Sequence, residues 1–195
     1  MLMELSQTVH TLKEWAVAID ALEAGKTIML LRKGGIREQP GRFRVAHQQV
    51  LLYPTFEHQQ PLLLKAEYAP LINPVASGWH PETVRIGSWA EITDFLPVSD
   101  ELVVNRLLPF HIWNEHFIRD RLKWKPQQPL FILLLRTYKL SQVQEIPYCA
   151  EYGGCKSWID IAQPINLEAS EPVLPDSDYQ YLTTKISTII TNKMH

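Results

Sequence analysis

The chain has 195 residues, of which 46% are hydrophobic and 21% are charged, and its formal net charge is -2. A chain of this length and apolar content can bury one sizeable core, so we expect one domain. The small net charge excludes a uniformly basic coat of the kind that wraps nucleic acid. The longest apolar run, LFILLL, is too short to span a membrane, and no signal-peptide pattern opens the chain. We therefore expect a cytoplasmic protein without a membrane partner.

Helical periodicity and then a short apolar run open the chain. Apolar residues recur at intervals of three and four in the first segment: Val9, Leu12, Ala16, Ile19 and Leu22. With Thr8 or Ser6 as N-cap and Gly25 at the C-terminal end, this spacing predicts a helix over residues 8–24. Residues 27–31 are short, apolar and partly β-branched, which predicts a buried strand that ends before Gly34 and Gly35.

The middle of the chain predicts strands interrupted by loops. Residues 49–53 read as a strand closed by Pro54, and residues 58–68 read as a short helix. Residues 83–95 are rich in Val, Ile, Trp and Thr, and predict one long strand or a bent pair around Gly87.

Two helices, a strand and an acidic tail follow. Residues 100–107 and 112–122 predict helices, and residues 129–140 predict a central strand that is apolar on both faces. A last helix is expected from about Asp178 to Thr191. Helices and strands without regular alternation favour an α+β fold with a mixed or barrel-like sheet and flanking helices. We expect one domain over residues 1–163, followed by an acidic, proline-containing linker and a C-terminal helix over residues 164–195.

Positive charge is concentrated in two windows. Residues 26–47 and 119–139 together hold twelve of the nineteen lysines and arginines with only two acids, which leaves seven cations and nineteen acids elsewhere. If the windows meet in space, the molecule has one positive face. A glycine-containing loop rich in arginine can bind phosphates, and Trp124 between two lysines can stack on a base. The alternative is a solvated loop whose arginines pair with surface acids.

Catalytic and metal-binding patterns are weak. Cys149 or Cys155 with His47, His58, His111 or His116 offers the residue types for acyl transfer, but a buried inert thiol is the simpler interpretation. His111 and His116 are five residues apart and do not share one helical face, so the spacing does not indicate a zinc pair. We predict no cofactor and no metal, and the two cysteines are expected to be reduced.

Several motifs in one order resemble a bacterial domain-of-unknown-function family that is frequent in cyanobacteria. The matching segments run from about residue 10 to residue 160 and are HTLKEWAVAIDALEAGKTIMLLRKGGIRE, VLLYPTFEHQ, HIWNEHFIRDRLKW, LLLRTYKL and EYGGCKSW. The resemblance implies no established activity. The family's association with restriction-endonuclease-type domains implies a part in restriction-modification or in other nucleic-acid transactions, with a nuclease as a possible partner.

A shorter stretch, AGKTIMLLR, is similar to the opening of ASCH domains. That resemblance implies a PUA-like barrel that binds RNA, or a hydrolase of small amides that uses a lysine and a glutamate. An apolar residue stands here where the family's strand carries an acid, which weighs against the hydrolase.

Three functional hypotheses follow. The first is a nucleic-acid-binding domain, for DNA or RNA without sequence preference, whose residues are Arg32, Lys33, Arg37, Arg42, Arg44, Arg121, Lys123, Trp124 and Lys125. The second is a small-molecule hydrolase with a polar pocket formed by Lys26, Arg32, His47, Tyr53 and His58. The third is a protein-protein adaptor that docks through the acidic tail.

Overall fold

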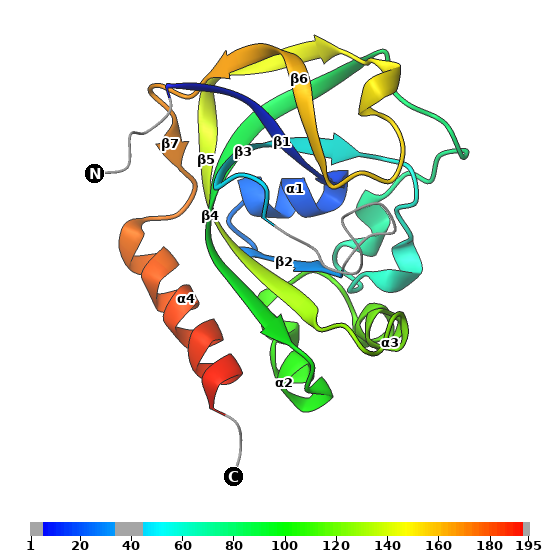
Figure 1. The fold of residues 1–195 in the computed structure, drawn as a ribbon, viewed down its shortest axis with the longest axis vertical. Coiled ribbons are helices and arrows are strands. Elements are labelled where there is room, and N and C mark those ends of the chain that lie inside the picture. The colour runs from blue at the N-terminus through cyan, green and yellow to red at the C-terminus, as the bar shows by residue number, and fades with distance from the viewer. Residues whose placement is uncertain (1–5, 34–44, 193–195) are drawn as a thin grey trace.

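One mixed sheet organises the molecule (Figure 1). The computed structural model describes residues 6–33 and 45–192. The strands are β1 Gln7–Trp15, β2 Met29–Arg32, β3 Gln49–Thr55, β4 Thr83–Val98, β5 Leu130–Pro147, β6 Trp158–Asn166 and β7 Glu171–Pro172. Their order is β2-β5-β4-β3-β1-β6, with β7 on β5, and only β1 and β3 run parallel. The predicted α+β fold with a mixed sheet is confirmed.

The sheet curves but does not close. Within the described ranges, the path ends at β2 on one side and at β6 on the other, and these two strands do not pair. The curvature comes from β4 and β5, whose register shifts between Ile86 and Ser88 and again between Ile92 and Asp94. Bulges of this kind bend a strand and raise its twist. The bend expected around Gly87 is therefore present, in an open sheet and not in a closed barrel.

Four α-helices in the described part of the chain flank the sheet: α1 Ala16–Glu23, α2 Glu101–Arg106, α3 Glu115–Lys123 and α4 Asp176–Thr191. Asp100 caps α2 and Asn114 caps α3, each by accepting a backbone N–H bond with its side chain. α4 joins the main core through Ile186, which is fully buried, and through Tyr179, whose hydroxyl lies 2.6 Å from that of Thr93 in β4. The predicted last helix is confirmed, whereas the domain boundary at residue 163 lies inside β6 and stays a prediction.

The predicted helix over residues 8–24 is wrong in its first half. Residues 7–15 form β1, a strand between β3 and β6, and only residues 16–23 are helical. Apolar spacing of three and four does not distinguish one helix from a strand that runs into a helix. Residues 7–15 form a strand because β1 pairs with a neighbouring strand on both sides. Gly25 does end α1, with a φ of 66°.

The predicted helix over residues 58–68 is also absent. The segment carries a 3-10 turn, η2 Pro61–Leu63, and a second turn follows at η3 Ala69–Leu71. His58 has a φ of 66°, which no helix tolerates. The remaining predicted strands, over residues 27–31, 49–53, 83–95 and 129–140, match β2, β3, β4 and β5.

The core lies on both faces of the sheet. Along β3, Val50 and Leu52 belong to a large cluster beneath the helices, whereas Leu51 and Tyr53 belong to a smaller one on the opposite face. This alternation is what a strand buried on both faces requires. No helix in the described part of the chain is long and apolar enough to cross a membrane.

Candidate functional site

The two cationic windows meet where β2 ends beside α3. Lys33 directly follows β2 and is only 7% exposed. Its Nζ donates to the carbonyl oxygens of Arg121 at 2.7 Å and Leu122 at 3.2 Å, in the last turn of α3. The C-terminal end of a helix carries partial negative charge, which a lysine ammonium stabilises. The contact joins residues that are 88 positions apart and brings the two cationic windows together at this point.

Arg32 holds this junction from the inner side. Its guanidinium lies 3.0 Å from the Glu14 carboxylate and also donates to the carbonyl oxygen of Lys13. Arg121 lies nearby, with its guanidinium over the ring of Phe117 at 4.9 Å. Burial, and then the neighbouring Arg121, lowers the pKa of Lys33, and burial lowers the pKa of Arg121. Arg32 and Lys33 therefore mainly hold β2 against β1 and α3, and little of either side chain is exposed to solvent.

The exposed part of the junction is the end of α3 and the turn after it. Lys123 is exposed, and Trp124 keeps 37% of its surface in solvent. The Lys125 ammonium lies 4.7 Å from the centre of the Trp124 ring, within the range of a cation–π interaction. Trp113 and Phe117, by contrast, are buried, as the predicted core stripe requires. We call Arg32, Lys33, Arg121, Lys123, Trp124 and Lys125 the basic face.

Three residues of the predicted interface cannot be placed beside the basic face. Arg37, Arg42 and Arg44 lie outside the described residues. Their assignment to the interface stays a prediction from the sequence.

The five residues of the predicted polar pocket lie in different surroundings. Lys26 is exposed, His58 is exposed beside Glu57, and His47 stacks on His10. Tyr53 is buried against Tyr152, and Arg32 is paired as described above. Among the described residues, no hydrogen bond, ion pair or ring contact joins any two of these five. The polar pocket therefore stays a prediction from the sequence.

A buried polar group on β1 was missed from the sequence. Lys13 lies opposite Tyr53 in the parallel β1–β3 pair, and its Nζ donates to the carbonyl oxygens of Tyr152 at 2.6 Å and Gly154 at 2.9 Å. Burial lowers the pKa of Lys13 and raises the pKa of Tyr53. These bonds fix the EYGGC turn to the sheet. In the predicted helix, Lys13 had no reason to point inward, so only recognition of the strand could have found it.

The thiols show no arrangement for nucleophilic catalysis. Cys149 is half-buried and Cys155 is exposed, and both are free. Within the described part of the chain, no hydrogen bond joins either thiol to a histidine, and the Cys149 thiol donates to the Pro147 carbonyl oxygen at 3.9 Å. The residue types for acyl transfer are present without the geometry.

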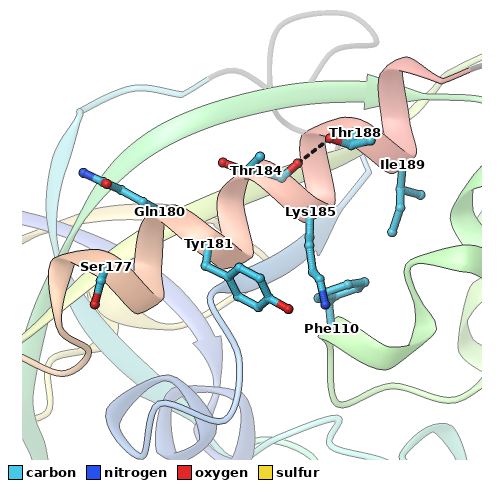
Figure 2. A pocket seen from close by; sticks show the side chains of 8 residues that line it. All are labelled: Phe110, Ser177, Gln180, Tyr181, Thr184, Lys185, Thr188 and Ile189. Atoms are coloured by element: carbon cyan, nitrogen blue, oxygen red, sulfur yellow. Dashed lines mark hydrogen bonds between the residues drawn. The ribbon is translucent and has the colours of Figure 1, made fainter.

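A groove of about 760 Å³ runs along α4 (Figure 2). The Lys185 side chain extends from the helix toward Phe110, and Tyr181 and Ile189 flank it. Of the eight residues that line the groove, Lys185 alone is charged. The groove contains no member of the predicted pocket and offers no carboxylate or imidazole for acid–base chemistry.

Comparison with solved structures finds three crystal structures of the ASCH protein from Zymomonas mobilis. A serine-to-alanine variant and a tyrosine-to-phenylalanine variant each align with a TM-score of 0.47 and 12% identity, over 90% of this chain and 94% and 96% of theirs. A third structure of the ASCH protein gives a TM-score of 0.45 and 13% identity, over 90% of this chain and 93% of its own.

No curated protein matches the chain. The model of one family, described as a domain of unknown function (DUF1802), matches residues 11–185. The match continues past residue 160, where the recognised motifs end, and includes most of α4. The tail expected to lie outside the resemblance is thus largely within it. The chain belongs to the DUF1802 family of domains of unknown function.

Proposed function

We propose that this domain acts in the cytoplasm and contacts the backbone of a nucleic acid, DNA or RNA, through the basic face and without sequence preference. The contact of Lys33 with the end of α3 carries the proposal, because it joins the two cationic windows beside an exposed tryptophan. Lysines that lie near phosphates release counterions, and an exposed aromatic ring accepts any base on its face. The acidic remainder of the surface repels phosphate and orients the encounter.

The division of roles within the basic face explains why little sequence preference is expected. Arg32 is committed to Glu14, and Lys33 is committed to carbonyl oxygens, so these two residues support the surface from behind. The exposed Lys123, and Lys125 whose ammonium lies over the Trp124 ring, offer positive charge to phosphates, which carry no base information. Trp124 stacks, and stacking tolerates every base. Arg37, Arg42 and Arg44 extend the positive charge in the sequence.

Binding to labelled duplex DNA, single-stranded DNA and RNA of equal length tests the proposal. The paired variant Lys123→Ala with Lys125→Ala should bind each of them more weakly than the natural protein. Lys156→Ala with Lys185→Ala is the matched control, because it removes the same charge from exposed positions that lie outside both cationic windows, before β6 and on α4. Equal losses in both pairs, or affinity that does not change with salt, would contradict the proposal.

We propose, from the family resemblance, that a nuclease acts on the nucleic acid that the basic face holds, as in restriction-modification. We expect a nuclease to co-purify with the natural protein and to be absent from the Lys123→Ala, Lys125→Ala variant. That result would show that bound nucleic acid links the nuclease to the domain. Nuclease digestion of the extract before purification should then release that partner as well.

A further inference from the structure

Three potential metal ligands from distant parts of the chain meet across β1, from β1 itself and from the chain at its two neighbouring strands. His10 lies in β1, Asp160 in β6, and His47 just before β3. The His10 Nδ1 atom is 2.7 Å from Asp160 Oδ1. The imidazole rings of His10 and His47 stack with their centres 3.5 Å apart and their planes 4° from parallel. One ligand atom from each of the three side chains lies within 4.8 Å of the other two.

Strand pairing fixes this arrangement. His10 is directly opposite Asp160 in the antiparallel β1–β6 pair, and the register shifts between Thr8 and His10. The Thr8 hydroxyl accepts the His10 backbone N–H bond at 3.1 Å within this irregularity. A bulge of this kind re-aims a side chain. The third ligand reaches the group because β3 runs parallel to β1, which places the approach to β3 beside the start of β1.

We propose that His10, His47 and Asp160 bind one divalent transition-metal ion of the zinc class. Two neutral imidazoles and a carboxylate form the three-ligand set that zinc accepts when its fourth position is left to water. The Asp160 side chain is 62% exposed and that of His10 is 31% exposed, so an ion can enter from solvent. The site is independent of the basic face and shares no residue with it.

The stacked rings set a geometric condition for binding. Each imidazole donates its lone pair in the plane of its ring, so two parallel rings 3.5 Å apart cannot both point at one ion. His47 must therefore turn about its side-chain torsions, which its place outside the strand allows. Ligand atoms around a tetrahedral ion are on the order of 3.3 Å apart for bonds of about 2.0 Å. The exposed Asp160 carboxylate thus has to retreat by roughly half an ångström from His10.

Titration of the tag-free full-length protein with Zn²⁺ alone, followed by calorimetry, tests the site. We expect one ion per chain and an affinity at least about tenfold lower in His10→Ala, His47→Ala and Asp160→Asn, since each removes a direct ligand. His116→Ala is the matched control: His116 is exposed and lies 3.6 Å from the Asp120 carboxylate, the same pair of groups without a second histidine. The control should bind Zn²⁺ as the natural protein does.

Co²⁺ provides a second readout, because its visible absorption reports tetrahedral coordination by protein ligands. Strong absorption that disappears in His47→Ala would support the site. His47 lies outside the strands, so this variant tests the proposal even where His10→Ala fails to fold. Absence of Zn²⁺ binding, or undiminished binding in His47→Ala, would overturn the proposal and leave His10 and Asp160 as an ordinary ion pair.

Discussion

Two glycines with left-handed backbones allow two costs of an alanine substitution to be compared: the strain of a positive φ and the crowding of the added Cβ. Gly25 has a φ of 66°, and a Cβ there would lie 2.8 Å from Leu174 Cδ2, whereas Gly78 has a φ of 80° and open space around it. Gly78→Ala should lower the free energy of unfolding by about 1–2 kcal/mol, the cost of the backbone conformation alone. Gly25→Ala should lower it further, because Leu174 must shift. Equal losses in urea unfolding would contradict the close packing at Gly25.

A buried histidine makes stability depend on pH. Burial, and then the neighbouring Lys65 ammonium, lowers the pKa of His111 from 6.5 to about 3. The unfolded chain therefore binds a proton at His111 that the folded chain does not, so stability falls as the pH drops from 6.5 toward 3. The loss attributable to this residue approaches about 1.4 kcal/mol per pH unit in that window. Urea unfolding of His111→Gln between these pH values should show a shallower decline than the natural protein, and identical slopes would contradict the assignment.

Trp124 should distinguish single strands from duplexes. An unpaired base can stack on its exposed ring, whereas the bases of a duplex are already stacked on one another. Trp124→Ala should weaken binding of single-stranded DNA by about 1–3 kcal/mol and should weaken duplex binding less. Trp79→Ala is the control, because Trp79 is 45% exposed and packs edge-on against Phe56 in a separate loop. A uniform loss for both nucleic acids would indicate that Trp124 supports the local fold.

At the scale of elements, a substitution in α4 tests whether the domain ends at residue 163. Ile186 is fully buried in the main core, so Ile186→Ala should lower the free energy of unfolding by about 2–5 kcal/mol. Lys185→Ala, one position away and exposed, should have little effect. Both values come from urea unfolding followed by circular dichroism. A negligible loss in Ile186→Ala would mean that the tail is dispensable, as the predicted boundary implies.

The elements show which sequence patterns predict structure and which do not. The apolar run around Leu133 predicted a central strand, and β5 pairs on both sides as expected. Such a strand is buried on both faces, so its sequence is continuously apolar and does not alternate between apolar and polar residues. β1 was mistaken for a helix, because its strand conformation depends on pairing with β3 and β6, which are remote in the sequence. The same error concealed Lys13 and His10, whose neighbours become visible only when the strand pairs are known.

At the scale of the whole molecule, the distribution of charge along the sequence describes a surface only when it is combined with the fold. Two windows of cations were visible in the sequence, but their contact at Lys33 depends on the path of β2 beside α3. Among the described residues, no direct contact joins the members of the predicted pocket, which stays a prediction. Residue types were right for a polar site, and the sheet distributed Tyr53, His47 and His58 to separate places. Composition restricts the chemistry of a surface, whereas long-range pairing decides which groups share it.

The salt dependence of binding measures how many charges of the whole molecule touch phosphate. Each phosphate contact on duplex DNA contributes about -0.9 to the slope of log affinity against log salt. Removal of Lys123 and Lys125 together should therefore make the slope shallower by about 2, whereas the Lys156→Ala, Lys185→Ala pair should keep the slope of the natural protein. Titrations from about 50 mM to 200 mM salt give the slopes. If both double variants lost affinity at an unchanged slope, the lysines of the basic face would not contact phosphate, and the positive face would serve another ligand.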